Sequence, residues 1–283
     1  MARPFALVAL VVAAVLIASA TLTSCQPVTG GRYVQQVFAA WEQVATAETY
    51  RTALDFDLNA NIELKLDVYQ PQGDTNLLRP VQMWMHGGAW TKGVGDRTMM
   101  TGYAQDAARR GYVGVNIDYR LRTTAVLPAA ALDAYDDASA AVAWLKANAT
   151  RFRIDPDAIM AGGYSAGSVN AMNLVYTPYE RLANPPAPSA VIGAFGIAGA
   201  NMGLPAANRP PVIMFSAVDD SVVPHSSVVD RCTADQAAGN VCELVSYPTG
   251  DHYIAFSQID DIEARSAQFA MTNLLPKAGY YLA

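Results

Sequence analysis

The residues with the clearest chemical potential lie in Gly163-Tyr164-Ser165-Ala166-Gly167, a G-x-S-x-G motif. A short apolar run, residues 158–161, precedes the motif, and residues 168–174 after it have the composition of a helix. Strand, tight turn and helix form the context in which this motif raises a serine hydroxyl above the end of a strand. The turn strains the serine backbone, and the flanking glycines must be small because neighbouring chain passes close to them. Ser165 is therefore the predicted nucleophile.

An attacking serine needs a base to take its proton. The chain has three histidines. His86 opens a Gly-Gly turn, where we expect it to bond locally, and His225 follows Pro224 at the start of a predicted helix. His252 lies in a loop after the last long predicted strand, at the same sheet end as Ser165. We therefore predict His252 as the base, with His225 as the alternative.

The base needs an acid to orient it, and that acid should lie between the serine and the histidine in the sequence, after a strand. Asp219 and Asp220 both satisfy this condition. Adjacent side chains leave a turn in different directions, so only one of them can face His252. The spacing Asp-x-x-Val-Pro from Asp220 to Pro224 favours Asp220. Asp219 is the alternative and is otherwise expected to cap the turn.

A serine that attacks a carbonyl also needs N–H donors for the oxyanion that forms. The segment 86–90, His-Gly-Gly-Ala-Trp, follows the predicted strand 81–85, and its small residues allow backbone N–H groups to point at one place. We assign as donors the N–H groups of Gly88, Ala89 and Ala166. The chemistry requires no metal and no organic cofactor, and we expect neither.

The N-terminus predicts an export signal. Arg3 and the free amine precede an apolar run over residues 5–20, and Leu22-Thr23-Ser24-Cys25 is similar to the lipobox of bacterial lipoproteins. In such signals the chain is cut before the cysteine, which is acylated and tethers the protein to a membrane. A transmembrane anchor and plain secretion are the alternatives. We expect residues 1–24 to be a signal peptide, residues 25–32 a polar tether and residues 33–283 one catalytic domain.

Composition and the remaining cysteines fit an exported globular domain. Hydrophobic residues make up 52% of the 283 residues and charged residues 16%, which is ample material for a core. The net charge of −6 argues against a nucleic-acid partner, whose binding surface would be basic. Cys232 and Cys242 form an even pair once Cys25 is set aside, and we expect a disulfide in an oxidising compartment. Two buried free thiols are the alternative.

Hydrophobic periodicity predicts alternating strands and helices. Residues 33–49 are expected to be helical, followed by antiparallel strands 54–58 and 62–69 that are joined near residues 59–61. Further strands are expected at 81–85, 112–118, 158–161, 191–197, 211–217 and 243–247, and further helices at 98–110, 129–147, 226–237 and 257–275. This alternation predicts a mainly parallel sheet covered on both faces, with a site outside the carboxyl ends of the strands.

These motifs resemble the α/β-hydrolase superfamily, close to its carboxylesterase, feruloyl-esterase-like and hormone-sensitive-lipase-like branches with an HGG(x)W oxyanion motif. The resemblance spans residues 64–256 and includes the segments 118–121, 127–130 and 154–157. It implies an α/β-hydrolase fold with about eight strands and no large cap domain, and a structural ion pair between Arg120 and Asp137. Ala89 and Tyr164 depart from the lipase-like branch.

The resemblance implies a serine hydrolase that cleaves carboxylic esters through an acyl-enzyme. Esters of short acyl chains or aromatic acids, including esters carried on polymers, are the expected substrates, and the membrane is the expected partner through Cys25. A serine amidase or peptidase on the same fold is one alternative, because a triad does not by itself distinguish amides from esters. A noncatalytic surface-binding lipoprotein is the other.

Overall fold

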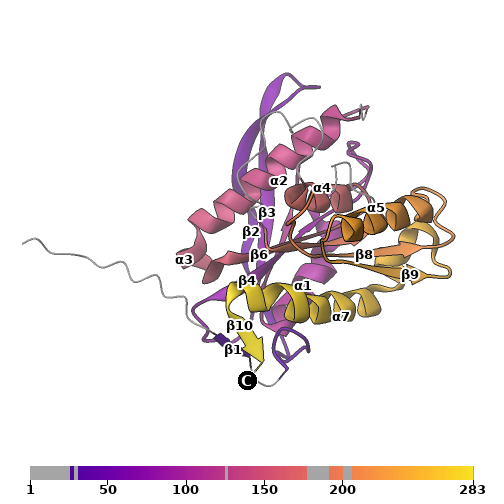
Figure 1. Cartoon of the computed structure of the whole chain (residues 1–283). Coiled ribbons are helices and arrows are strands. Elements are labelled where there is room, and N and C mark those ends of the chain that lie inside the picture. The colour runs from indigo at the N-terminus through magenta and orange to yellow at the C-terminus, as the bar shows by residue number, and fades with distance from the viewer. Residues whose placement is uncertain (1–25, 29–30, 125–126, 177–190, 200–205, 283) are drawn as a thin grey trace, which may run out of the picture.

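The computed structural model describes residues 26–28, 31–124, 127–176, 191–199 and 206–282 (Figure 1). The predicted signal peptide and Cys25 lie outside these residues. The main sheet has eight strands in the order β2-β3-β5-β4-β6-β7-β8-β9. Its strands are β2 (Trp41–Asp55), β3 (Ala60–Pro71), β4 (Arg79–Met85), β5 (Val113–Ile117), β6 (Ile154–Tyr164), β7 (Gly193–Ile197), β8 (Val212–Ala217) and β9 (Cys242–Tyr247). β3 runs antiparallel to both of its neighbours and all other pairings are parallel, so the predicted mainly parallel sheet is confirmed.

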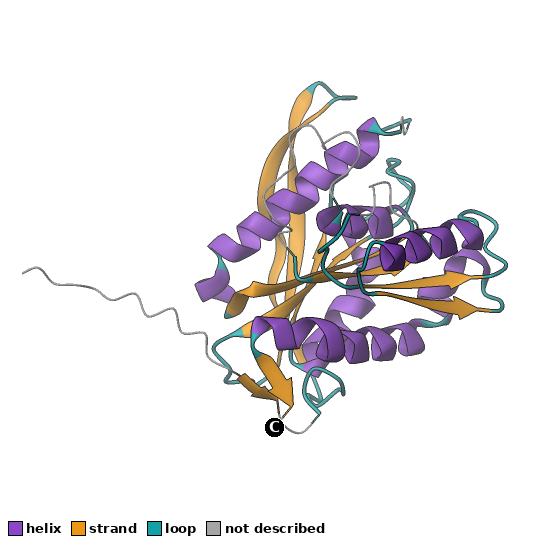
Figure 2. Cartoon of the chain, viewed as in Figure 1, coloured by secondary structure: helices purple, strands orange, loops and turns teal. Residues whose placement is uncertain are grey.

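Helices cover both faces of this sheet, as predicted (Figure 2). The longer ones are α1 (Thr101–Arg110), α2 (Ala129–Ala147), α4 (Ala166–Val175), α5 (His225–Ala237) and α7 (Ile259–Phe269). The helices α2, α4 and α5 lie on one side and α1 and α7 on the other (Figure 1). Short helical segments are η1 (Arg97–Met100), α3 (Ala149–Phe152), η3 (Asp251–Tyr253), α6 (Ile254–Ser257), η4 (Ala270–Leu274) and η5 (Leu275–Ala278).

The two faces of the sheet form two separate cores because successive side chains of a strand point to opposite faces. In β4, Val81, Met83 and Met85 pack into the core beneath α2 and α4. Trp84 points the other way, into the core beneath α1 and α7. The central strands therefore read as continuous apolar runs, since both of their faces are buried.

A second, two-stranded sheet joins the two ends of the described chain. β1 (Gln26–Val28) pairs in parallel with β10 (Tyr280–Leu282), and the register places Gln26 opposite Tyr280. Part of the segment expected to be a free tether is thus held by backbone hydrogen bonds against the C-terminal strand (Figure 1).

The helix predicted for residues 33–49 is wrong. Residues 41–49 belong to the edge strand β2, which pairs with β3 along its whole length. The pairing contains three register shifts, and Ala47 has a φ of 49°. Such bulges interrupt the two-residue alternation by which a half-buried strand is recognised, and this explains the misreading.

Two boundaries also differ from the prediction. β2 ends at Asp55, because its carboxylate accepts hydrogen bonds from the N–H groups of Asp57 and Leu58 and so turns the chain. The closing helix begins at Ile254 and is divided into α6, α7, η4 and η5 instead of running unbroken. Within the described residues, no helix combines the length and the apolar character needed to cross a membrane.

Candidate active site

The predicted nucleophile lies in a strained turn between β6 and α4. Ser165 has a φ of 54° and a ψ of −118°, and its N–H donates to the carbonyl of Ile197 at 2.8 Å. A Cβ on Gly163 would lie 2.2 Å from the carbonyl of Gly167, and a Cβ on Gly167 would lie 2.1 Å from the carbonyl oxygen of Met85. Both glycines are therefore required by close backbone approach, as the motif predicts.

The structure brings Ser165, His252 and Asp220 together in one hydrogen-bonded chain. His252 Nε2 lies 2.9 Å from Ser165 Oγ, and His252 Nδ1 lies 2.9 Å and 3.1 Å from the two carboxylate oxygens of Asp220. The Asp220 side chain is fully buried. The three residues follow β6, β9 and β8, parallel strands whose carboxyl ends meet at one edge of the sheet. Imidazole between hydroxyl and carboxylate is the arrangement that activates a serine.

Asp219 does not cap its own turn, as was expected, but binds the neighbouring loop that carries His252. Its carboxylate accepts hydrogen bonds from the N–H groups of Asp251 at 2.8 Å and of Gly250 at 3.3 Å, in the loop that carries His252. In return, the Asp251 carboxylate accepts from the N–H and the hydroxyl of Ser221, both at 2.8 Å. The loops of the acid and of the base are thus linked in both directions.

The other two histidines are not placed to act as the base. His225 Nε2 lies 3.3 Å from the hydroxyl of Ser246, and it is His252, not His225, that is hydrogen-bonded to Ser165. His86 bonds locally as predicted, with Nδ1 2.6 Å from the carbonyl oxygen of Gly87 and its ring stacked on Tyr119. Burial lowers the pKa of His86 and outweighs the opposing effect of the Gly87 carbonyl, so its imidazole is neutral at pH 7.

Two of the three predicted oxyanion residues border the cavity beside Ser165. Gly88 and Ala89 line the cavity beside Ser165, and Ala166 is the first residue of α4, where an N–H has no partner within the helix. Among the described residues, the N–H groups of Gly88 and Ala89 donate to no other backbone group. The two cavity-lining residues therefore carry N–H groups that have no backbone acceptor among the described residues.

A cavity of about 320 Å³ opens beside Ser165 and His252. Apart from these two residues and from Gly88 and Ala89, its lining is apolar or aromatic and comes from Val94, Met99, Tyr164, Val222, Tyr253 and Phe256. The Tyr164 ring lies 5.3 Å from the imidazole of His252 and 5.2 Å from the ring of Phe256, measured between centroids. Burial raises the pKa of Tyr164 to about 12, so its phenol is neutral. The cavity thus offers a mostly uncharged surface to a ligand.

Sequence reasoning missed the aromatic wall of this cavity. Tyr253 and Phe256 follow His252 at positions one and four, which on a helix places Phe256 on the same side as the base. That spacing was the available signal, once His252 was identified.

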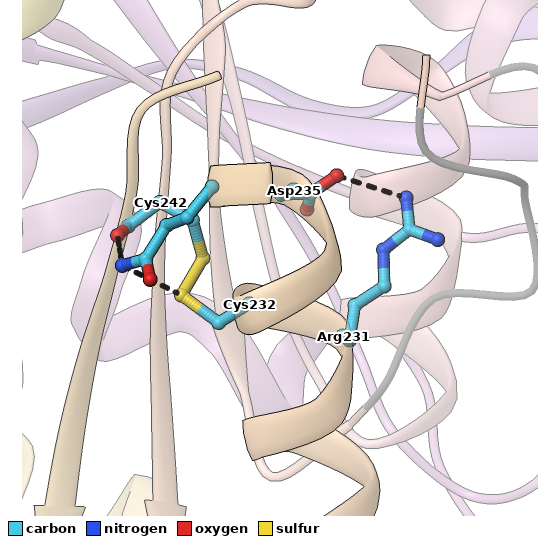
Figure 3. The surroundings of a disulfide bond; sticks show 5 residues. Arg231, Cys232, Asp235 and Cys242 are labelled. Atoms are coloured by element: carbon cyan, nitrogen blue, oxygen red, sulfur yellow. Dashed lines mark hydrogen bonds and ion pairs between the residues drawn. A yellow bond between two sulfur atoms is a disulfide. The ribbon is translucent and has the colours of Figure 1, made fainter. Parts of the chain in front are cut away.

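The structure joins Cys232 and Cys242 by a disulfide, the pairing that the sequence analysis expected. The bond connects α5 to the start of β9 (Figure 3). The disulfide therefore ties the helix that follows the Asp220 loop to the strand that precedes the His252 loop.

The ion pair implied by the resemblance is also present. Arg120 Nε lies 2.9 Å from the fully buried carboxylate of Asp137, which Arg51 also contacts at 2.6 Å. Within the part of the chain that the structure describes, no three histidine, cysteine or acidic side chains are grouped so that they could hold a metal ion.

Comparison with known proteins gives three kinds of match. The family model BD-FAE matches residues 66–182. Gut esterase 1 of Caenorhabditis briggsae is 33% identical over 121 residues, which is 41% of this chain and 21% of the relative. The para-nitrobenzyl esterase of Bacillus subtilis is 31% identical over 122 residues, 41% of this chain and 24% of that enzyme. The chain therefore spans about a fifth to a quarter of the length of these curated relatives.

Solved structures match over most of the chain. Esterase 2 of the planctomycete Thermogutta terrifontis, bound to propionate, has a TM-score of 0.67 at 22% identity, covering 81% of this chain and 94% of that one. The same esterase phosphonylated by cyclosarin has a TM-score of 0.69 with the same coverage. Together with the sheet order and the helices on both faces, these matches establish the α/β-hydrolase fold.

Proposed function

We propose that this chain is a carboxylic ester hydrolase in which Ser165 is the nucleophile, His252 the general base and Asp220 the acid that orients it. The observation that carries the proposal is the unbroken chain of contacts from the hydroxyl through the imidazole to the buried carboxylate. The matched part of its relatives belongs to proteins named as esterases, which supports the same class of reaction.

In this mechanism Ser165 attacks the ester carbonyl while His252 Nε2 takes the hydroxyl proton. Asp220 accepts the hydrogen bond of Nδ1–H and stabilises the imidazolium that forms. The N–H groups of Gly88, Ala89 and Ala166 receive the developing oxyanion, and each such donor contributes roughly 3 kcal/mol to transition-state binding in enzymes where one has been removed. His252 then protonates the leaving alcohol, and water repeats the sequence on the acyl-enzyme.

The cavity favours small uncharged esters. Its volume of about 320 Å³ and its apolar and aromatic lining fit a short acyl chain or an aromatic acid. Tyr253 is 63% exposed at the mouth, so part of a larger alcohol, including one borne on a polymer, can extend into solvent.

Hydrolysis of p-nitrophenyl acetate, measured beside an aminoacyl anilide, tests the proposal. We expect the wild-type chain to prefer the ester and Ser165→Ala to abolish both turnover and labelling by a fluorophosphonate. Ser226→Ala, an exposed serine in α5, is the matched control and should retain both activities. Preference for the anilide would instead indicate an amidase, and absence of labelling in the wild-type chain would indicate a noncatalytic protein.

We also propose that the chain is exported and held at the surface or periplasmic face of a bacterial membrane through lipid on Cys25. The apolar residues 5–20 and the lipobox-like residues 22–25 support this, as does the disulfide, which persists in oxidising compartments. Cys25→Ser should move the protein from the membrane fraction to the soluble fraction. Unchanged fractionation would contradict lipidation.

A further inference from the structure

The loop after β4 has an unusual backbone. Gly88, Ala89 and Trp90 have φ values of 112°, 51° and 57° in succession. Glycine adopts such values freely, but in alanine and tryptophan they cost conformational free energy. Contacts elsewhere must therefore hold Ala89 and Trp90 in place.

One such contact is made by the Trp90 side chain. The indole is buried, and its Nε1–H donates to Oδ1 of Asn170 at 3.0 Å. Asn170 lies in α4, five residues after Ser165, and is completely buried. A single buried hydrogen bond thus joins the loop of the oxyanion donors to the helix that follows the nucleophile.

This hydrogen bond stabilises the core less than two apolar side chains in the same space would. The Nδ2 atom of Asn170 is buried and has no hydrogen-bond partner among the described residues. A buried amide that leaves its own donors unpaired loses much of what its single bond contributes. Apolar side chains at both positions would fill the same space without an unpaired group. The pair therefore contributes something other than stability.

We infer that Asn170 is a positioning residue for the oxyanion site, an inference that rests on the proposed function. The three proposed donors come from two structural elements. Ala166 lies in α4, and Gly88 and Ala89 lie in the loop after β4. The helix and the strand before this loop are already in contact where Gly167 packs against the backbone of β4. The Trp90–Asn170 hydrogen bond adds a second contact, between the helix and the loop itself. Two attachments prevent the loop from pivoting, so all three N–H groups stay aimed at one oxygen.

The test compares Trp90→Phe, Asn170→Leu and the double variant. We measure kcat and KM for p-nitrophenyl acetate, inhibition by a trifluoromethyl ketone whose adduct with Ser165 carries the oxyanion, and Tm. Each single variant should lower kcat by about 10- to 100-fold, with KM changed less than about twofold and affinity for the ketone reduced by the same factor as kcat. The double variant should be no slower than the slower single variant, because both remove one bond.

Stability separates this role from a merely structural one. Each single variant leaves a buried polar group unpaired, whereas the double variant removes both groups, so its Tm should return toward the wild-type value while kcat stays low. Asn173→Leu is the control: Asn173 is also buried in α4, but Trp90 Nε1 does not donate to it. It should keep kcat within about twofold of wild type.

Two results would overturn the inference: recovery of kcat together with Tm in the double variant, or a loss of kcat in Asn173→Leu equal to that in Asn170→Leu. A wild-type chain without Ser165-dependent hydrolysis would be a different failure, that of the proposed function itself.

Discussion

Replacing Asp220 by asparagine gives a sharp test of the proposed acid, because both oxygens lie near His252 Nδ1 but only Oδ1 also accepts from the backbone. Oδ1 accepts hydrogen bonds from the N–H groups of Val222 at 2.9 Å and Val223 at 2.8 Å, while Oδ2 lies 2.9 Å from His252 Nδ1. In Asp220→Asn the amide oxygen takes the position that faces the two N–H donors. The amide NH₂ must then face His252.

The expected magnitude follows from the tautomer that this forces. Nδ1 has to accept a hydrogen bond, so a neutral imidazole carries its proton on Nε2, which lies 2.9 Å from Ser165 Oγ. A protonated Nε2 does not take the serine proton. The equivalent change in serine proteases lowers kcat about 10⁴-fold. We expect a loss of three to four orders of magnitude, or about 4 to 5 kcal/mol of activation free energy.

The assay is kcat for p-nitrophenyl acetate at pH 7, with Tm measured on every variant. Asp219→Asn is the matched control, since its amide oxygen can still accept from Gly250 or Asp251, and we expect it to lose less than about tenfold. If Asp220→Asn stays within tenfold of wild type while folded, or if Asp219→Asn is the slower variant, this reasoning is refuted.

Two further predictions concern stability and pH. Desolvation and the nearby charge of Asp106 raise the pKa of Glu263 from 4.5 to about 9, so the folded state holds this proton more tightly than the unfolded chain does. The free energy of unfolding should therefore decline as pH rises from about 4.5 to 9, by up to about 1.4 kcal/mol per pH unit. In urea unfolding measured across this pH range, Glu263→Gln should show a smaller decline per pH unit than wild type. An unchanged decline would contradict the prediction. Burial opposes ionisation of Asp74, but hydrogen bonds from Arg32 and Arg79 prevail and lower its pKa from 3.8 to about 2. The stability contributed by the ionised Asp74 carboxylate is present above pH 4 and is lost toward pH 2. Asp74→Asn should therefore be less stable than wild type by about 2 kcal/mol at pH 5 and should match wild type near pH 2. Guanidinium unfolding that gives the same difference in stability at both pH values would disprove this prediction.

The residues of the proposed triad could be predicted from the sequence because few residues could fill each role. Gly163 and Gly167 mark a turn that only small residues permit, and three histidines leave little choice of base. The central strands were equally clear, since burial on both faces gives them unbroken apolar runs.

The edge strand β2 was harder to predict, because its conformation depends on pairing with residues distant in the sequence. Val34, Val37, Trp41 and Val44 repeat at a spacing typical of a helix, and the bulges in β2 remove the competing alternation. Pairing with β3 decides the outcome, and pairing is a tertiary property.

For the two adjacent aspartates, the spacing to Pro224 favoured Asp220, but the contacts of Asp219 could not be predicted. Asp219 and Asp220 have identical chemistry, and only the path of the loop decides which one meets the imidazole and which one meets the backbone of Gly250 and Asp251. Similarly, the Trp90–Asn170 hydrogen bond joins residues eighty positions apart, and no local sequence pattern predicts it.

The hydrogen bonds that link the Asp220 loop to the His252 loop, through the carboxylates of Asp219 and Asp251, have a mechanical consequence. The acid and the base travel as one unit at the rim of the sheet, whereas the serine is carried by β6, two strands further in. The links between the two loops therefore fix the carboxylate relative to the imidazole, independently of the turn that carries the serine.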